Sequence, residues 1–267
     1  MFGNSNPLPL SDKFLESFQP KGKRYDVLAT LMKRSRSFEF YDFNIKALDT
    51  TNVWTVAAGG SATTWAVRAE AGGWIRGVTG TTTASAALQI YQPQKYWTGA
   101  AKAGVAFLWR SDVVQGVTYE MGFVNALPAI NTTVINDPTD PPTFNTSVDI
   151  AMFLYNHTGN ATAAPDQVGL YAANSSAATA QRSLKTVATL GGVPGPAAAT
   201  EHFVALEIDG TTVTCWIGDS PTPLKLTSAI TAANGVLPFF AVKGNNSTSK
   251  NADLDCIMTW AGRLGGP

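Results

Sequence analysis

Apolar and polar side chains alternate with a period of two along most of the chain from about Phe38 onward. Residues two positions apart lie on one face of a strand, so this period predicts β-structure rather than helices. Three segments show the two predicted faces most clearly. They are Val105, Phe107 and Trp109 against Ala106, Leu108 and Arg110; Val117, Tyr119, Met121 and Phe123 against Thr118, Glu120 and Gly122; and Val148, Ile150, Met152 and Leu154 against Asp149, Ala151, Phe153 and Tyr155.

Turn residues divide these runs into strands of similar length. Two alternating runs within 202–219 are joined through Asp209-Gly210, and Asp-Gly between such runs is a strong hairpin signal because a type I′ turn needs positive φ at both central positions. Two further strands are expected within 236–244 and 252–263. Clusters of Gly, Asn, Pro and Ser break the runs about every eight to twelve positions, as in an all-β sandwich or barrel. The segment 131–144 contains three prolines and two aspartates, so we expect a long exposed loop there.

The first 36 residues have a different character. They carry seven cations and three anions, a net charge of +4, so the formal net charge of zero for the whole chain hides a charge of −4 on the remainder. A short helix is expected from Ser11 to Phe18, and apolar residues from Tyr25 to Met32 recur at roughly helical spacing. We therefore expect two parts, a basic, partly helical N-terminal arm (1–36) and a β-sandwich domain (37–267). A loosely ordered terminus, solvated by its charges, is the alternative interpretation of the arm.

Composition removes several classes of protein. Charged residues make up 14% and apolar residues 45% of the chain, which excludes collagen-like, coiled-coil and wholly disordered classes. No stretch of 18 uninterrupted apolar residues occurs, and residues 1–20 lack the pattern of a secretion signal. We expect a soluble protein that is made in the cytoplasm, with no membrane partner. A nucleic-acid partner is not expected either, since general nucleic-acid binders need excess Lys and Arg.

The order of the strand and turn segments from 38 to 264 resembles a group of tailed-bacteriophage virion proteins. The segments that carry the resemblance are 38–56, 71–93, 96–126, 202–219 and 250–263. In that group a concanavalin A-like β-sandwich, or jelly roll, serves as a structural or surface module. The resemblance implies a virion component on the capsid surface, a capsid decoration or cement protein. A tail or fibre module that binds host-surface carbohydrate is the alternative that it leaves open.

For a decoration protein, the arm is the candidate contact with the major capsid protein or other virion subunits. Its apolar side chains would be buried against a neighbour while its cations meet carboxylates on an acidic surface. The candidate partner-binding residues are Phe14, Leu15, Phe18, Lys21, Lys23, Arg24, Leu28, Leu31, Lys33, Arg34 and Arg36. We also expect a homo-oligomer, and a trimer in particular, since viral modules commonly form trimers.

Some sandwiches of this shape are glycosidases, which use paired carboxylates. Retaining glucanases carry Glu-x-Asp-x-x-Glu on one strand. Here Glu207 and Asp209 supply the first two positions, but Thr212 occupies the third. Glu120 and Asp149 lack a carboxylate partner at i+2 or i+4, so we interpret them as rim or subunit-contact charges. We therefore expect no catalytic residues and a protein that is not an enzyme.

Other chemistry has little support in the sequence. The two histidines, His157 and His202, lie at predicted strand ends, and no phosphate-binding loop occurs, so no cofactor is expected. The pairs Asp137 with Asp140 and Asp253 with Asp255 offer oxygen ligands for calcium, but neither has EF-hand spacing, and we expect no metal. Cys215 and Cys256 are interpreted as two buried thiols, with one disulfide as the alternative.

Aromatic residues leave a carbohydrate-binding interpretation open. The candidate stacking platform consists of Trp54, Trp65, Trp74 and Trp97, although tryptophans equally fill the core of a sandwich or the centre of an interface, which is the interpretation we favour. Seven Asn-x-Ser/Thr triplets begin at Asn131, Asn145, Asn156, Asn160, Asn174, Asn245 and Asn246. Without a secretion signal, we interpret them as turn chemistry.

Overall fold

The computed structural model describes the following parts of the chain: residues 37–43, 49–51, 53–68, 74–81, 87–94, 97–111, 116–130, 132–145, 149–157, 167–174, 179–184, 201–218, 222–245 and 248–262. The arm 1–36, with its predicted helix and its partner-binding residues, lies outside the described residues, as does Val148. The predictions for the arm therefore stay predictions.

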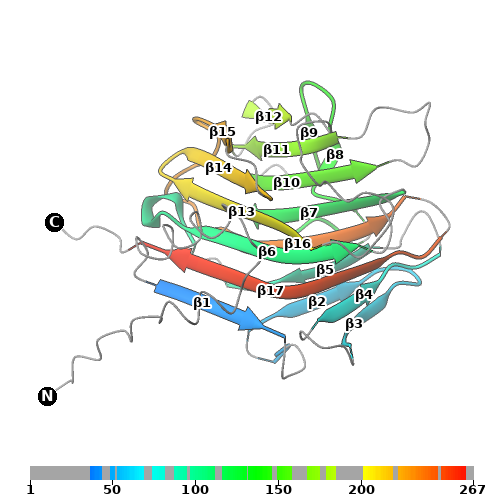
Figure 1. Ribbon diagram of the computed structural model, residues 1–267. Helices are drawn as coiled ribbons and strands as arrows, with labels where there is room; N and C mark the ends of the chain where they lie inside the picture. The colour runs from blue at the N-terminus through cyan, green and yellow to red at the C-terminus, as the bar shows by residue number, and fades with distance from the viewer. Residues whose placement is uncertain are drawn as a thin grey trace, which may run out of the picture.

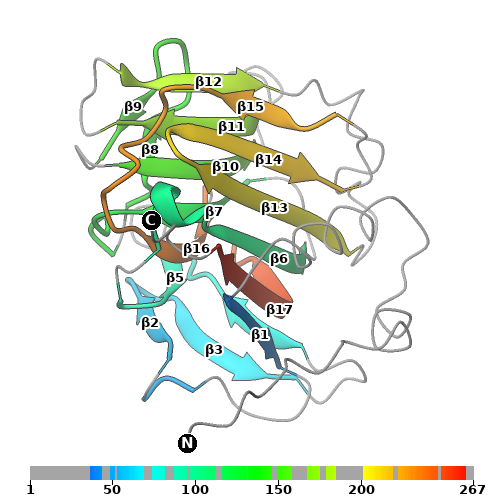
Figure 2. The ribbon, with the colours of Figure 1, turned by 90° about the vertical axis from the view of Figure 1, so that its left-hand side faces the viewer.

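Two antiparallel sheets form two stacked layers (Figures 1 and 2). Sheet A contains β1 (Ser37–Asp42), β3 (Thr63–Val67), β4 (Ile75–Val78), β6 (Gly104–Ser111), β13 (His202–Asp209), β14 (Thr212–Ile217), β15 (Leu224–Leu226) and β17 (Asn251–Ala261). Sheet B contains β2 (Thr55–Ala58), β5 (Ala87–Tyr91), β7 (Val117–Val124), β10 (Ile150–His157), β11 (Gln167–Ala173), β12 (Gln181–Leu184) and β16 (Leu237–Gly244). A short 3₁₀ turn, η1 (Gly99–Ala101), precedes β6, and β8 (Ile135–Asp137) pairs with β9 (Thr143–Phe144) outside both sheets.

The strands are ordered so that distant segments of the chain become neighbours. Sheet A runs β15-β14-β13-β6-β17-β4-β3, with β1 paired to β17, and sheet B runs β12-β11-β10-β7-β16-β5-β2. All these pairs are antiparallel, and β7 lies in the middle of sheet B between β10 and β16. The prediction of an all-β sandwich is confirmed.

The main core lies between the two sheets, as the alternation predicted. The ring centroids of Trp109 on β6 and Tyr119 on β7 lie 4.5 Å apart, and those of Phe107 on β6 and Phe240 on β16 lie 5.8 Å apart. Burial of these large rings stabilises the fold. The four candidate platform tryptophans (Trp54, Trp65, Trp74 and Trp97) are all buried, so they cannot form a surface for sugar stacking.

The predicted hairpin of β13 and β14 is confirmed, but its turn is shifted by one residue. Asp209 still pairs with Thr212 as part of the ladder, so the central residues are Gly210 and Thr211, and of the predicted pair only Gly210 has a positive φ, at +61°. Cys215 and Cys256 are buried thiols with no disulfide between them, as predicted. Among the described residues, the structure contains no helix with the length and apolar character needed to cross a membrane.

The prediction of a long exposed loop at 131–144 is confirmed only in part. Residues 132–144 fold back as the β8–β9 hairpin over the outer face of sheet B, the face turned away from sheet A (Figure 2). Val134 and Ile135 are buried there, and Phe144 packs on the same cluster. Asp137 and Asp140 remain exposed as predicted, so hydrophobic burial anchors the hairpin while its aspartates stay in solvent.

Candidate functional site

The outer face of sheet B changes from apolar to polar along its central strands. Three successive rows cross β10, β7 and β16: Met152, Gly122 and Phe239; then Leu154, Glu120 and Ala241; then Asn156, Thr118 and Lys243. The β8–β9 hairpin covers the apolar end, where its own apolar residues pack on Met152, Leu154 and Phe239. The polar row is left at the margin of the hairpin.

Glu120 fastens the hairpin to the sheet. Its Oε2 accepts a hydrogen bond from the backbone N–H of Val134 at 2.7 Å, and its Oε1 accepts one from the backbone N–H of Ile135 at 2.8 Å. The side chains of Tyr171 and Arg182 donate to the carbonyl oxygen of Pro138 at 3.3 and 2.6 Å. Side chains from three strands of sheet B therefore hold the main chain of the hairpin in place.

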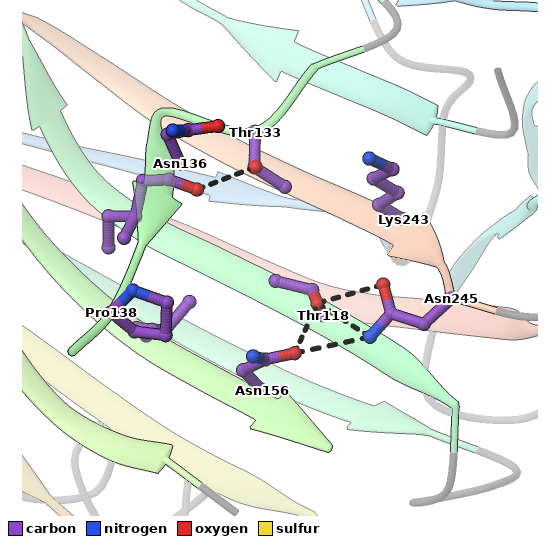
Figure 3. A pocket seen from close by; sticks show the side chains of 9 residues that line it. Thr118, Thr133, Asn136, Pro138, Asn156, Lys243 and Asn245 are labelled. Carbon is purple, nitrogen blue, oxygen red and sulfur yellow. Dashed lines mark hydrogen bonds between the residues drawn. The ribbon is translucent and has the colours of Figure 1, made fainter. Parts of the chain in front are cut away.

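A polar pocket of about 200 Å³ lies where the hairpin meets the polar row (Figure 3). The hairpin supplies one wall and the strands of sheet B supply the floor and the opposite wall. The lining residues are Thr118, Thr133, Ile135, Asn136, Pro138, Leu154, Asn156, Lys243 and Asn245. Seven of the nine are Thr, Asn, Pro or Lys, in contrast to the apolar cluster beside it.

Hydrogen bonds among three side chains fix the pocket floor. The hydroxyl of Thr118 donates to Asn156 Oδ1 at 2.8 Å, and Asn245 Nδ2 donates to Asn156 Oδ1 at 3.1 Å and to the Thr118 hydroxyl at 2.9 Å. Asn156 Oδ1 accepts two of these bonds. Its Nδ2 group donates to no other described side chain and so offers donors to a ligand, and Figure 3 shows this nitrogen on the side of Pro138. The floor is thus a preorganised set of amide and hydroxyl groups.

The two ionisable residues in this region, Glu120 and Lys243, differ in how far they are buried. Burial raises the pKa of Glu120 from an ordinary 4.5 to about 7, although the hydrogen bonds from Ile135 and Val134 and the charge of Lys243 act to lower it. Lys243 lines the pocket, whereas Glu120 is 1% exposed and is covered by β8. The prediction that Glu120 is a rim charge is wrong because the hairpin, which was expected to be a loop in solvent, buries it.

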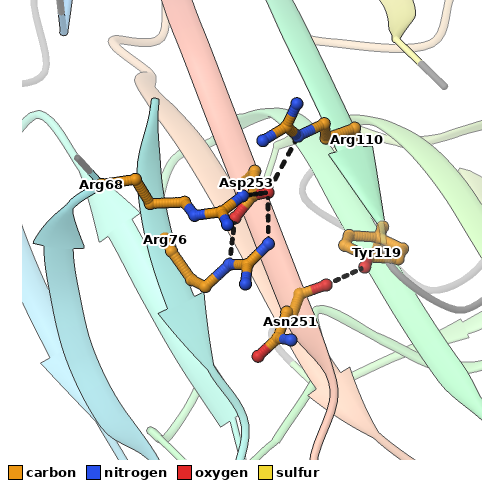
Figure 4. A network of polar contacts seen from close by, with 6 residues as sticks. All are labelled: Arg68, Arg76, Arg110, Tyr119, Asn251 and Asp253. Carbon is orange, nitrogen blue, oxygen red and sulfur yellow. Dashed lines mark hydrogen bonds and ion pairs between the residues drawn. The ribbon is translucent and has the colours of Figure 1, made fainter. Parts of the chain in front are cut away.

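A second polar cluster lies on the outer face of sheet A (Figure 4). Asp253 of β17 accepts hydrogen bonds from Arg76 at 2.6 and 2.7 Å, from Arg110 at 2.9 Å and from Arg68 at 3.2 Å. Arg110 also lies 4.1 Å from the ring centre of Trp74, a cation–π geometry. Arginines from three different segments surround the carboxylate, so the alternative in which Asp253 offers its oxygens to calcium has no support.

The remaining candidate residues have structural partners. The indole N–H of Trp260 donates to Glu207 at 3.4 Å, and Asp209 forms an exposed ion pair with Lys102 at 3.0 Å. Asp149 is 1% exposed rather than at a rim, because it accepts hydrogen bonds from the backbone of Thr231 and from the side chain of Asn234.

The structure also places His202 and the carboxylates that were considered as metal ligands. His202 begins β13, as expected, and stacks near Trp109 with ring centroids 5.2 Å apart. Within the described ranges, no group of three or more His, Cys, Asp or Glu residues is placed to hold a metal ion. The carboxylates predicted as possible ligands instead have protein partners or lie apart.

Comparison with solved structures identifies the fold. A β-glucanase from Bacillus licheniformis superposes with a TM-score of 0.52 at 13% identity, covering 85% of this chain and 98% of that chain. A pseudo β-1,3-glucanase of Mycobacterium tuberculosis gives a TM-score of 0.55 at 9% identity over 84% and 98%. The exoplasmic/lumenal domain of VIP36, in its Ca²⁺/Man-bound form, gives 0.55 at 9% identity over 86% and 91%.

The fold is a concanavalin A-like sandwich. At identities of 9–13% these likenesses establish the fold and leave the activity of this chain open. No protein-family model and no curated protein sequence matches the chain.

The expectation that the chain is not an enzyme has to be corrected. Its structural neighbours include β-glucanases and a glycosidic hydrolase, so this sandwich is a scaffold on which glycoside cleavage occurs. Carboxylate spacing along the sequence, at Glu207 on β13 and at Glu120 on β7, gave no catalytic pair. Such spacing does not reveal the pocket on the outer face of sheet B, which forms beside Glu120 from distant segments.

The pocket residues escaped prediction because they come from distant segments. Thr118, Asn156 and Asn245 meet only when β7, β10 and β16 pair. A weak signal was present in the alternation: Asn156 and Lys243 each occupy the polar end of an otherwise apolar strand face, and Thr118 shares its face with Glu120.

Proposed function

We propose that this protein is a carbohydrate-binding β-sandwich whose ligand occupies the pocket between sheet B and the β8–β9 hairpin. The observation that carries the proposal is the network of Thr118, Asn156 and Asn245 at the floor of a pocket of about 200 Å³. Amide and hydroxyl groups in fixed orientations match the alternating donors and acceptors of sugar hydroxyls. A pocket smaller than the roughly 300–1,000 Å³ of drug-sized ligand sites suits a single sugar ring at the end or side of a glycan.

The structural neighbours support a glycan as ligand. One of them is a Ca²⁺/Man-bound domain and others are β-glucanases, so the scaffold recurs in proteins directed at sugars. The resemblance of the strand order to tailed-bacteriophage virion proteins adds a setting, in which the sandwich is a virion module that contacts carbohydrate on the host surface. The pocket, and not a tryptophan platform, is the binding element of this proposal.

A glycan array tests the proposal with full-length protein. Wild-type protein is expected to bind a limited set of glycans, and Thr118→Val and Asn156→Ala are expected to lose that binding at least about tenfold, since each removes hydrogen bonds from the floor. Thr214→Val is the matched control because Thr214 lies on β14 of sheet A, far from the pocket in the strand order. Absence of glycan binding by the wild type, or equal loss in the control, would refute the proposal.

Glycoside cleavage is a second candidate function, favoured by Glu120. With a pKa of about 7, this carboxyl group is protonated in about half of the molecules at neutral pH, as a general acid requires. Glu120 lies one row from the pocket floor, beneath β8. Hydrolysis also needs a second carboxylate, and none lines the pocket among the described residues. Release of reducing ends from mixed-linkage β-glucan, abolished by Glu120→Gln, would establish this function, and no release by wild-type protein would reject it.

The role of capsid decoration is a separate proposal that depends on the arm. It predicts that the cations of the arm are needed to bind assembled capsids. Full-length protein with Lys33, Arg34 and Arg36 changed to Glu should bind capsids more weakly than wild type in a sedimentation assay, and more so at low salt. Unchanged binding would exclude the arm as the docking element.

A further inference from the structure

The pocket contains one charged side chain, Lys243. It lies on the outer face of β16, opposite Thr118 in the register, and is half-buried. Among the described residues, it forms no hydrogen bond and no ion pair. Figure 3 shows it on the other side of the pocket from Asn136 and Pro138. Its three donors are therefore available within the pocket.

No carboxylate lines the described pocket to neutralise this ammonium group. The other eight lining residues are uncharged. The charge of Lys243 acts to lower the pKa of Glu120, but β8 covers Glu120 and both its oxygens accept backbone hydrogen bonds. Asp137 of β8 is turned to its own loop, where it accepts a hydrogen bond from the backbone of Thr139. A ligand that enters the pocket consequently meets a positive charge and neutral polar groups.

We propose that the pocket selects a sugar that carries a carboxylate, with the Lys243 ammonium group pairing with that carboxylate and the floor amides binding the ring hydroxyls. This inference rests on the proposed function and adds the class of ligand. A neutral sugar could use the floor formed by Thr118, Asn156 and Asn245 but would leave the ammonium group to solvent. A uronic acid satisfies both, and charge-assisted hydrogen bonds are stronger than neutral ones.

Matched pairs of sugars test this inference by isothermal titration calorimetry. The probes are glucuronic, galacturonic and mannuronic acid, each compared with glucose, galactose and mannose. At least one acid is expected to bind wild-type protein about tenfold or more tightly than its neutral counterpart, with the difference shrinking in high salt. Lys243→Gln should remove this preference, and Lys243→Arg should retain most of it.

Lys225→Gln is the matched control, since Lys225 is an exposed lysine of β15 in sheet A. Thermal unfolding should show that all three variants are folded. Equal affinity of wild-type protein for acids and neutral sugars, or an unchanged preference in Lys243→Gln, would overturn the inference while leaving the proposed function in place. Binding of neither kind of sugar would overturn both.

Discussion

Glu120 and Lys243 are diagonal neighbours on the outer face of sheet B, and they have different roles. Glu120 on β7 faces the backbone N–H groups of the β8–β9 hairpin, whereas Lys243 on β16 lines the pocket that the hairpin closes. The Glu120 side chain thus holds the hairpin that forms one wall of the pocket, and the Lys243 ammonium group is left to bind a ligand.

The first prediction concerns the pH dependence of stability. Since the pKa of Glu120 rises from 4.5 to about 7 on folding, the folded state holds this proton more tightly than the unfolded state. The contribution of Glu120 to the free energy of unfolding is therefore present below about pH 4.5 and is lost as the pH rises through about 7. Urea unfolding of wild type and Glu120→Gln from pH 5 to pH 8 should show the variant gaining about 2–3 kcal/mol relative to wild type. A constant difference across this range would contradict the assigned pKa.

The arginine cluster of sheet A gives a second prediction. The side chain of Asp253 is 3% exposed and that of Arg110 is 9% exposed. Desolvation raises the pKa of Asp253, but hydrogen bonds and charge from Arg76 and Arg110 together lower it below its ordinary value. Asp253→Asn should reduce the free energy of unfolding by about 3–5 kcal/mol at pH 7, because it leaves a buried guanidinium group without its counter-charge.

Asp209→Asn is the control for that measurement. Asp209 and Lys102 pair at the surface, with side chains 45% and 53% exposed. Loss of an exposed pair costs about 1 kcal/mol or less, and the substitution leaves the Gly210-Thr211 turn unchanged. Equal costs for the two substitutions would show that Asp253 is not the buried centre of the cluster.

Gly122 allows a third prediction about the centre of sheet B. Its φ is +153°, and a Cβ atom added there would lie 2.2 Å from the carbonyl oxygen of Ala151 on β10. Gly122→Ala should therefore push β7 and β10 apart and prevent stable folding or cost several kcal/mol. Gly210→Ala is the comparison, since that site has open space and only its φ of +61° opposes alanine, at about 1 kcal/mol. Urea unfolding of both variants should show the larger loss at Gly122.

Sequence reasoning predicted those parts of the fold that depend on neighbouring residues. Alternation separated the two faces of β6, β7 and β10 without showing which face is inward, and Asp209-Gly210 predicted one hairpin. It failed where the outcome depends on distant contacts. The three prolines of segment 131–144 predicted a loop, whereas Val134 and Ile135 anchor a hairpin there. The burial of Glu120 was missed as well, because it depends on that hairpin.

The candidate site could not be predicted from the sequence either, because it also depends on contacts between distant segments. The polar floor joins residues of β7 and β10 with Asn245, which follows β16, and only strand order brings these segments together. The Asn-x-Ser/Thr triplets that begin at Asn156 and Asn245 were interpreted as residues that favour turns. Their amides instead bond to each other and to Thr118 across the sheet.

Side-chain amide NMR tests most directly whether a sugar occupies this pocket. In a titration of ¹⁵N-labelled wild-type protein with the tightest-binding glycan, the Nδ2 resonances of Asn156 and Asn245 should shift along one saturable curve. The resonance of Asn174, in a turn after β11, should stay in place. Shifts confined to residues of sheet A, or no saturable shift at Asn156, would contradict a carbohydrate site on the outer face of sheet B.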